Sequence, residues 1–265
     1  MYGFRSVVSP ALAVSILAAP IRRAAADEGH PDPRCDGVHS LASPLPEACL
    51  GVIDTDRPHQ TDTPHVVPAG HVQFESAVAA VQLDRGRLLL FDDNYKFGLV
   101  SRIDLQVAFK HSEYSTTERR LLPPGPFQVR AKFNVVDERG YVPAVTLVPW
   151  IFLPLNGSQP LRGGALAFWG WELPAHLELE MNAGILLGTK PKPPAAIVLA
   201  SALTYTVVGT FRVFADVYAT GWDIALGTGA LWAFTRAMQV DLGTYVGLSG
   251  DEPAVTPFVG FSVRR

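Results

Sequence analysis

The chain has 265 residues, of which 48% are hydrophobic and 18% charged, and its formal net charge is −3. This near-neutral balance gives no reason to propose a nucleic-acid partner, and no run of about 18 apolar residues indicates a membrane-spanning helix. The composition is also compatible with one soluble β domain, so the assignment depends on the order of residues along the chain.

The first 26 residues have the order of a secretory signal peptide. Arg5 precedes an apolar stretch at 7–19, and three alanines at 24–26 come directly before Asp27. A basic start, a short apolar stretch and small residues at the cleavage site are the three parts of such a signal. We therefore expect residues 1–26 to direct export.

Residues 27–69 are expected to form a periplasmic segment ahead of the first strand. They contain the only two cysteines, Cys35 and Cys49, and an oxidising periplasm favours a disulfide between them over two free thiols. Five of the seven histidines lie in or beside this segment: His30, His39, His59, His65 and His71. Their spacing matches no closed metal site, so we expect no bound metal. The segment is then either a solvated tether or a plug that folds into a pore from the periplasmic side.

From residue 70 onward, hydrophobicity alternates from one residue to the next. The clearest segments are 103–110, 127–135, 176–185 and 239–248. A strand between lipid and a watery interior has this period of two, and an α-helix does not. Weaker segments of the same kind are 70–83, 88–97, 141–153, 165–173, 195–207, 211–219, 224–234 and 258–264. Together they predict an all-β fold, an antiparallel up-and-down transmembrane β-barrel of about 12 strands over residues 70–265.

The connections between these strands alternate in length. Those expected on the periplasmic side are short: 98–102, 137–140, 174–175, 208–209 and 235–238. Those expected outside are mostly longer: 112–126, 154–163, 188–194 and 249–256, with 84–86 and 220–223 as short exceptions. Short periplasmic turns with longer outer loops are typical of outer-membrane barrels. An even number of strands also brings both ends of the barrel to one side.

A motif before the first strand resembles a known family. Residues 55–64 read Thr-Asp-Arg-Pro-His-Gln-Thr-Asp-Thr-Pro, and residues 70–75 read Gly-His-Val-Gln-Phe-Glu. This order resembles the opening of the outer-membrane transporter family labelled putative MetA pathway of phenol degradation, and the likeness continues at 97–99, 153–157, 240–243 and 260–264. The motif residues are Asp56, Arg57, Pro58, Thr61, Gly70, His71, Gln73 and Glu75. The resemblance implies an outer-membrane transporter of hydrophobic or aromatic compounds.

Two features depart from the pattern of such barrels. The chain ends on Val263-Arg264-Arg265, whereas the resemblance implies a final aromatic residue that helps the assembly machinery to recognise the last strand. Pro149 also falls inside the predicted strand 141–153, where it removes a ladder hydrogen bond.

Twelve charged residues of the predicted strands share the inward parity. They are Glu75, Asp92, Lys96, Asp104, Lys110, Arg130, Lys132, Glu178, Glu180, Arg212, Asp216 and Asp241. Because a charge facing lipid is costly, we expect all of them to line the lumen. They either pair with one another and fill it, or filter solutes by charge and width. The basic set Lys110, Arg130 and Lys132 favours anions, and Glu178 with Glu180 would offset it.

We interpret the chain as a bacterial outer-membrane channel for passive passage of small solutes, with no cofactor and no catalytic residues. Its expected partners are outer-membrane lipid, the solute and the barrel-assembly machinery. The alternatives are a closed structural or ligand-binding barrel, a soluble periplasmic β-sandwich, and an outer-membrane lipid hydrolase that uses His111, Ser112 and Glu113. Neighbouring strand residues point to opposite faces, which argues against a dyad of His111 and Ser112.

Overall fold

The computed structural model describes residues 33–57, 60–82, 87–115, 120–121, 127–155, 161–188, 195–249 and 255–265. The expected signal peptide, His30, Pro58 and His59 lie outside these residues. The described part contains two short 3-10 helices, η1 (Pro33–Cys35) and η2 (Glu47–Cys49), and thirteen strands. No helix in this part is long and apolar enough to cross a membrane.

The strands follow one another along the chain with short connections. They are β1 (Val72–Gln82), β2 (Arg87–Val100), β3 (Ile103–Ser115), β4 (Arg120–Leu121), β5 (Phe127–Val136), β6 (Ala144–Leu153), β7 (Arg162–Leu173), β8 (Leu177–Gly188), β9 (Ala195–Val208), β10 (Phe211–Thr220), β11 (Asp223–Thr235), β12 (Met238–Ser249) and β13 (Thr256–Arg264).

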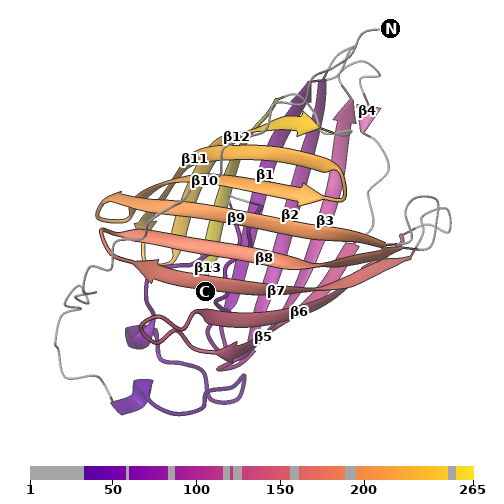
Figure 1. The fold of residues 1–265 in the computed structure, drawn as a ribbon. Helices are drawn as coiled ribbons and strands as arrows, with labels where there is room; N and C mark the ends of the chain where they lie inside the picture. The colour runs from indigo at the N-terminus through magenta and orange to yellow at the C-terminus, as the bar shows by residue number, and fades with distance from the viewer. Residues whose placement is uncertain are drawn as a thin grey trace, which may run out of the picture.

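Twelve long strands close into a barrel (Figure 1). Each long strand pairs antiparallel with its neighbours in sequence, and β1 pairs with β13 to close the sheet. The two-residue strand β4 only extends one end of β3. The predicted up-and-down β-barrel of about 12 strands is therefore confirmed.

Alternation along each strand sorts side chains between the two faces of the barrel. On β9, Leu199 and Leu203 are 50% and 45% exposed, whereas Ala202 and Thr204 are 1% and 3% exposed. Leu242 of β12 and Val259 of β13 likewise lie on the exposed, apolar outer face. Such a surface is what a barrel presents to hydrocarbon.

Strand bounds differ from the prediction in a few places. The segment 141–153 begins as a strand only at Ala144, because Arg139 and Val142 form an isolated bridge across a tight turn in which Gly140 has φ +62. Strand β3 runs to Ser115 and β8 to Gly188, farther into the predicted outer connections than expected. Parts of those longer connections lie outside the described residues.

Pro149 is incorporated in β6, but it interrupts one ladder. Pairing of β6 with β7 is continuous through Pro149 and Ala165. Pairing with β5 stops after Arg130 with Trp150 and resumes at Phe133 with Leu147. The missing amide hydrogen of proline accounts for this interruption.

The N-terminal segment has two parts, which we name the cap (residues 33–50) and the plug (residues 51–69). The cap contains the predicted Cys35–Cys49 disulfide and lies at the end of the barrel where the short turns are (Figure 1). Its backbone N–H at Leu41 donates to Leu99 O at 3.0 Å, just before the turn between β2 and β3.

The chain enters and leaves the plug at one place. The backbone N–H of Leu45 donates to Ala69 O at 3.0 Å, and a ring nitrogen of His71 donates to Leu45 O at 2.7 Å. Gly70 adopts φ +81 here, and a Cβ on it would lie 2.5 Å from Pro44, so only glycine fits. The plug is thus a loop with both ends fixed at the short-turn end of the barrel.

Candidate functional site

The plug is held inside the barrel by a cluster of buried charges centred on Asp56. One carboxylate oxygen of Asp56 lies 2.7 Å from Lys96 Nζ and 3.1 Å from Arg130 Nη2, and the other contacts Lys132 Nζ. Lys96 and Lys132 are only 2% and 1% exposed. Burial would raise the pKa of Asp56, but Lys132, Lys96 and Arg130 outweigh it and hold that pKa well below its usual range.

Further carboxylates complete this charge cluster. Asp62 of the plug pairs with Arg130 at 2.8 Å, and Glu75 of β1 contacts Lys96. A buried charge that loses its partner costs several kcal/mol, roughly 3–5. The cluster therefore fixes the plug strongly against the wall formed by β1, β2 and β5.

Polar side chains of the wall also satisfy the backbone of the plug. The N–H groups of Val67 and Gln60 donate to Asp104 Oδ2 at 2.9 Å and Asp216 Oδ2 at 2.8 Å. Gln73 donates to Asp54 O at 2.6 Å. Since an irregular segment carries unpaired backbone groups that must be satisfied when buried, these side chains allow a loop to occupy the lumen.

The plug approaches the wall closely at Pro64. A Cβ on Gly170 of β7 would lie 2.6 Å from Pro64 Cγ, so glycine makes room for the proline ring. Thr146 of β6 donates a hydrogen bond to the carbonyl of Pro64. Packing and charge thus hold the plug on different sides.

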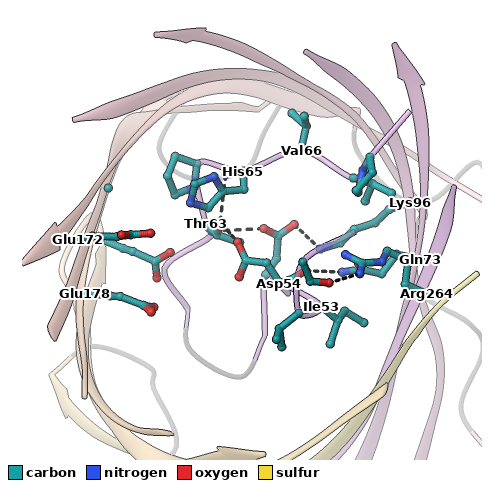
Figure 2. A pocket seen from close by; sticks show the side chains of 18 of the residues that line it. Ile53, Asp54, Thr63, His65, Val66, Gln73, Lys96, Glu172, Glu178 and Arg264 are labelled. Carbon is teal, nitrogen blue, oxygen red and sulfur yellow. Dashed lines mark hydrogen bonds and ion pairs between the residues drawn. The ribbon is translucent and has the colours of Figure 1, made fainter. Parts of the chain in front are cut away.

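A cavity of about 480 Å³, which we name the turn-side cavity, lies between the plug and the short-turn end. Figure 2 shows Glu172 and Glu178 on one wall, Lys96, Gln73 and Arg264 on the other, and Asp54, Thr63 and His65 between them. Arg212 pairs with Glu178 at 3.1 Å. Burial would raise the pKa of Asp54, but His65, Arg212 and a hydrogen bond from Thr63 together lower it.

A second cavity of about 550 Å³, the loop-side cavity, lies on the other side of the plug. Its aromatic residues include Tyr218, Tyr245 and Phe258, with Tyr245 stacked on Phe258 at a centroid distance of 5.2 Å. The guanidinium of Arg57 in the plug lies 5.9 Å from the Phe258 ring centroid. This cavity combines an aromatic wall with a charged floor.

Most of the predicted lumen residues meet at these features. Glu75, Lys96, Asp104, Arg130, Lys132 and Asp216 contact the plug, and Glu178 pairs with Arg212. Glu180 lines the turn-side cavity and Asp92 the loop-side cavity. Asp241 is 1% exposed, and neither of its carboxylate oxygens has a hydrogen-bond partner in the described structure. The side chain of Lys110 lies outside the described part.

The predicted motif residues are those at which the plug and the wall meet. Asp56 forms the charge cluster, Gly70 and His71 close the ends of the plug, and Gln73 donates to Glu75 Oε1 at 2.8 Å. Thr61 is fully buried. No group of His, Cys, Asp and Glu side chains among the described residues is arranged to hold a metal ion.

Two parts of the site were not predicted. Asp54 and Asp62 belong to the plug but carried no expected role, because their partners are distant in sequence. The aromatic wall was also missed, although Tyr245 shares the inward parity of Gln239 and Asp241, and this parity was the available signal.

A closed twelve-stranded barrel with an apolar exterior and a charged lumen defines the class of outer-membrane β-barrels. A family model described as Putative MetA-pathway of phenol degradation matches residues 55–264. This is most of the chain, and the protein belongs to that family.

Solved structures share the fold. The barrel is similar to the COG4313 outer membrane channel from Pseudomonas putida F1, with 9% sequence identity, a TM-score of 0.61 and coverage of 79% of this chain and 99% of that chain. The KdgM porin in complex with disordered oligogalacturonate matches with 11% identity, a TM-score of 0.48 and coverage of 73% and 98%. No curated protein sequence matches the chain significantly.

Proposed function

We propose that this protein is a bacterial outer-membrane channel for passive passage of small solutes, and that the plug closes it until it moves. The observation that carries the proposal is the position of the plug between two cavities in the lumen, held by the charges around Asp56. A purely structural barrel would need no segment of this kind, since side chains alone fill the interior of small barrels. In this proposal the cap faces the periplasm and the long loops face outward.

The solute class is proposed from the loop-side cavity. Tyr218, Tyr245 and Phe258 offer flat apolar faces to a solute that enters from the loop end. A volume of about 550 Å³ is within the range of small-molecule sites. This supports solutes with an apolar or aromatic body, in agreement with the description of the family.

A reversible tether between plug and wall tests the proposal. Gln239 Nε2 donates to Thr55 Oγ1 at 2.7 Å, so Thr55→Cys with Gln239→Cys, in a Cys35→Ser, Cys49→Ser background, joins the plug to β12. We expect proteoliposomes with the oxidised protein to swell in a small sugar no faster than empty liposomes, and reduction to restore the rate. Each single-cysteine variant serves as a control. Equal swelling before and after reduction, with the disulfide verified on gels, would refute plug movement.

A closed ligand-binding barrel is the second candidate, and the extensive bonding of the plug favours it. It predicts no swelling in either redox state. The hydrolase alternative rests on His111, Ser112 and Glu113, whose side chains lie outside the described part, and it would be tested by release of fatty acid from phospholipid.

A further inference from the structure

Three basic side chains of the wall surround one carboxylate of the plug. We propose that Lys96, Arg130 and Lys132, which we name the basic clamp, recognise the carboxylate group of a passing solute, and that Asp56 occupies this place in the closed state. The inference rests on the proposed channel function and names a solute class, small organic carboxylates with an apolar or aromatic body.

The geometry around Asp56 is that of a carboxylate-binding site. Both oxygens are engaged, one by Lys96 Nζ and Arg130 Nη2 at 2.7 and 3.1 Å and the other by Lys132 Nζ. All three cations come from the barrel wall, on β2 and β5, and only the anion comes from the plug. Charge-assisted hydrogen bonds of this kind are among the strongest that bind a carboxylate.

Two of the three cations depend on the plug for their anionic partners. The described hydrogen bonds of Lys132 go to Asp56, Thr63 O at 2.8 Å and His65 O at 3.2 Å, all in the plug. The ion pairs of Arg130 go to Asp56 and Asp62, also in the plug. Only Lys96 keeps a partner in the wall, Glu75. Movement of the plug therefore leaves buried cations that a solute anion would satisfy.

The sign of the local charge changes when the plug moves. In the closed state the three cations of the clamp face four described carboxylates, two from the plug (Asp56 and Asp62) and two from the wall (Glu75 and Asp104). The wall alone keeps three cations and two carboxylates. The open lumen thus favours anions at the position where the closed lumen holds an excess of acids.

The clamp is next to the aromatic cavity. Asp56 and Arg130 line the loop-side cavity together with Phe109 and Phe152, and Lys132 Nζ lies 5.4 Å from the Phe168 ring centroid. A solute that enters between aromatic rings would therefore bring its carboxylate toward the clamp. A carboxylate on an aromatic ring combines both recognition elements.

The test compares benzoate with benzamide, which has the same shape and no charge, in planar bilayers containing the refolded full-length protein. We expect benzoate to increase the open probability of the wild type about tenfold and benzamide to leave it unchanged. Asp56→Asn should open without benzoate and shift the reversal potential in a salt gradient toward anion selectivity. Lys132→Met in the Asp56→Asn background should abolish that selectivity.

The Asp137→Asn variant is the matched control, because Asp137 pairs with Arg102 at an exposed turn outside the lumen. It should behave as the wild type. If Asp56→Asn conducts but is not anion-selective, or if benzoate and benzamide act alike on a conducting wild type, the clamp is refuted while the channel stands. If neither the wild type nor Asp56→Asn conducts, although both show heat-modifiable migration as folded barrels, the channel itself is refuted. Asp62→Asn provides a second opening variant should Asp56→Asn fail to fold.

Discussion

Asp56 is the residue on which the closed state depends most. Its side chain is 5% exposed overall, and a carboxylate at this depth is tolerated only with full compensation. The wall supplies three cations for it, whereas the other contacts of the plug are mainly single hydrogen bonds. Charge at one position therefore contributes more to closure than any other single contact of the plug.

The glycine at position 170 gives a test of closure that changes no charge. A Cβ there would lie 2.6 Å from Pro64 Cγ, so Gly170→Val must displace the plug or the strand. We expect a steric cost of roughly 1–3 kcal/mol and an open fraction at least about fivefold higher in single-channel recordings. Gly188→Val is the control, since its added Cβ meets only Arg162 Cγ at 3.6 Å. Equal open fractions in the two variants would contradict close packing of the plug.

The carboxylates of the plug determine how closure responds to acid. The lowered pKa of Asp56 means that its contribution is complete above the ordinary value of 3.8 and is lost only as the pH falls through the lowered pKa. Burial raises the pKa of Asp62; Arg130 opposes this shift and the charge of Asp56 adds to it. Protonation of Asp62 therefore favours the docked plug as the pH falls.

We expect the conductance of the closed wild type to stay unchanged from about pH 7 to about pH 5. Bilayer recordings across this range check it. A conductance that rises on acidification in the wild type, and does not rise in Asp56→Asn, would show that Asp56 gains a proton far more readily than its cations allow.

At the scale of elements, β6 is the strand whose sequence conflicts most with its position. Pro149 interrupts pairing with β5 between Trp150 and Leu147, yet β6 remains a strand because its other ladder, with β7, is complete. Pro149→Val supplies the missing amide, and we expect it to stabilise the barrel by about 1 kcal/mol. Urea unfolding in lipid vesicles, followed by tryptophan fluorescence, measures this. Stability equal to or below the wild type would mean that the gap has another cause.

The strands were predictable because the rule that forms them is local. A residue on a strand faces lipid or lumen according to its parity alone, so alternation in 127–135 or 239–248 indicates both the strand and its inner face. Where the prediction was wrong, at 141–143, a local turn through Gly140 overrides the alternation.

The plug was not predictable in the same way. Asp56 finds Lys132 76 residues away, and Thr55 finds Gln239 184 residues away. No local pattern links such pairs, and the segment 51–69 has neither a strand period nor a helix period. The sequence therefore left a tether and a plug as equal alternatives, and it was the family resemblance that drew attention to Asp56 and Gln73.

At the scale of the whole molecule, the barrel contains two cavities with a plug between them. The turn-side cavity is lined by acids such as Glu172 and Glu178, and the loop-side cavity by aromatic rings. The plug is fixed at both ends where Leu45, Ala69 and His71 meet. It is therefore expected to move as a loop within the lumen, while the cap stays attached at the short-turn end.

The most direct test of this account is single-channel conductance of the refolded protein in planar bilayers, with and without residues 27–69. Both forms should first show heat-modifiable migration, which establishes a folded barrel. We expect rare, small openings from the full chain and a steady, larger conductance from the shortened one, because removal of the plug joins the two cavities. Silence in both forms would contradict a plugged channel and would identify the protein as a closed barrel.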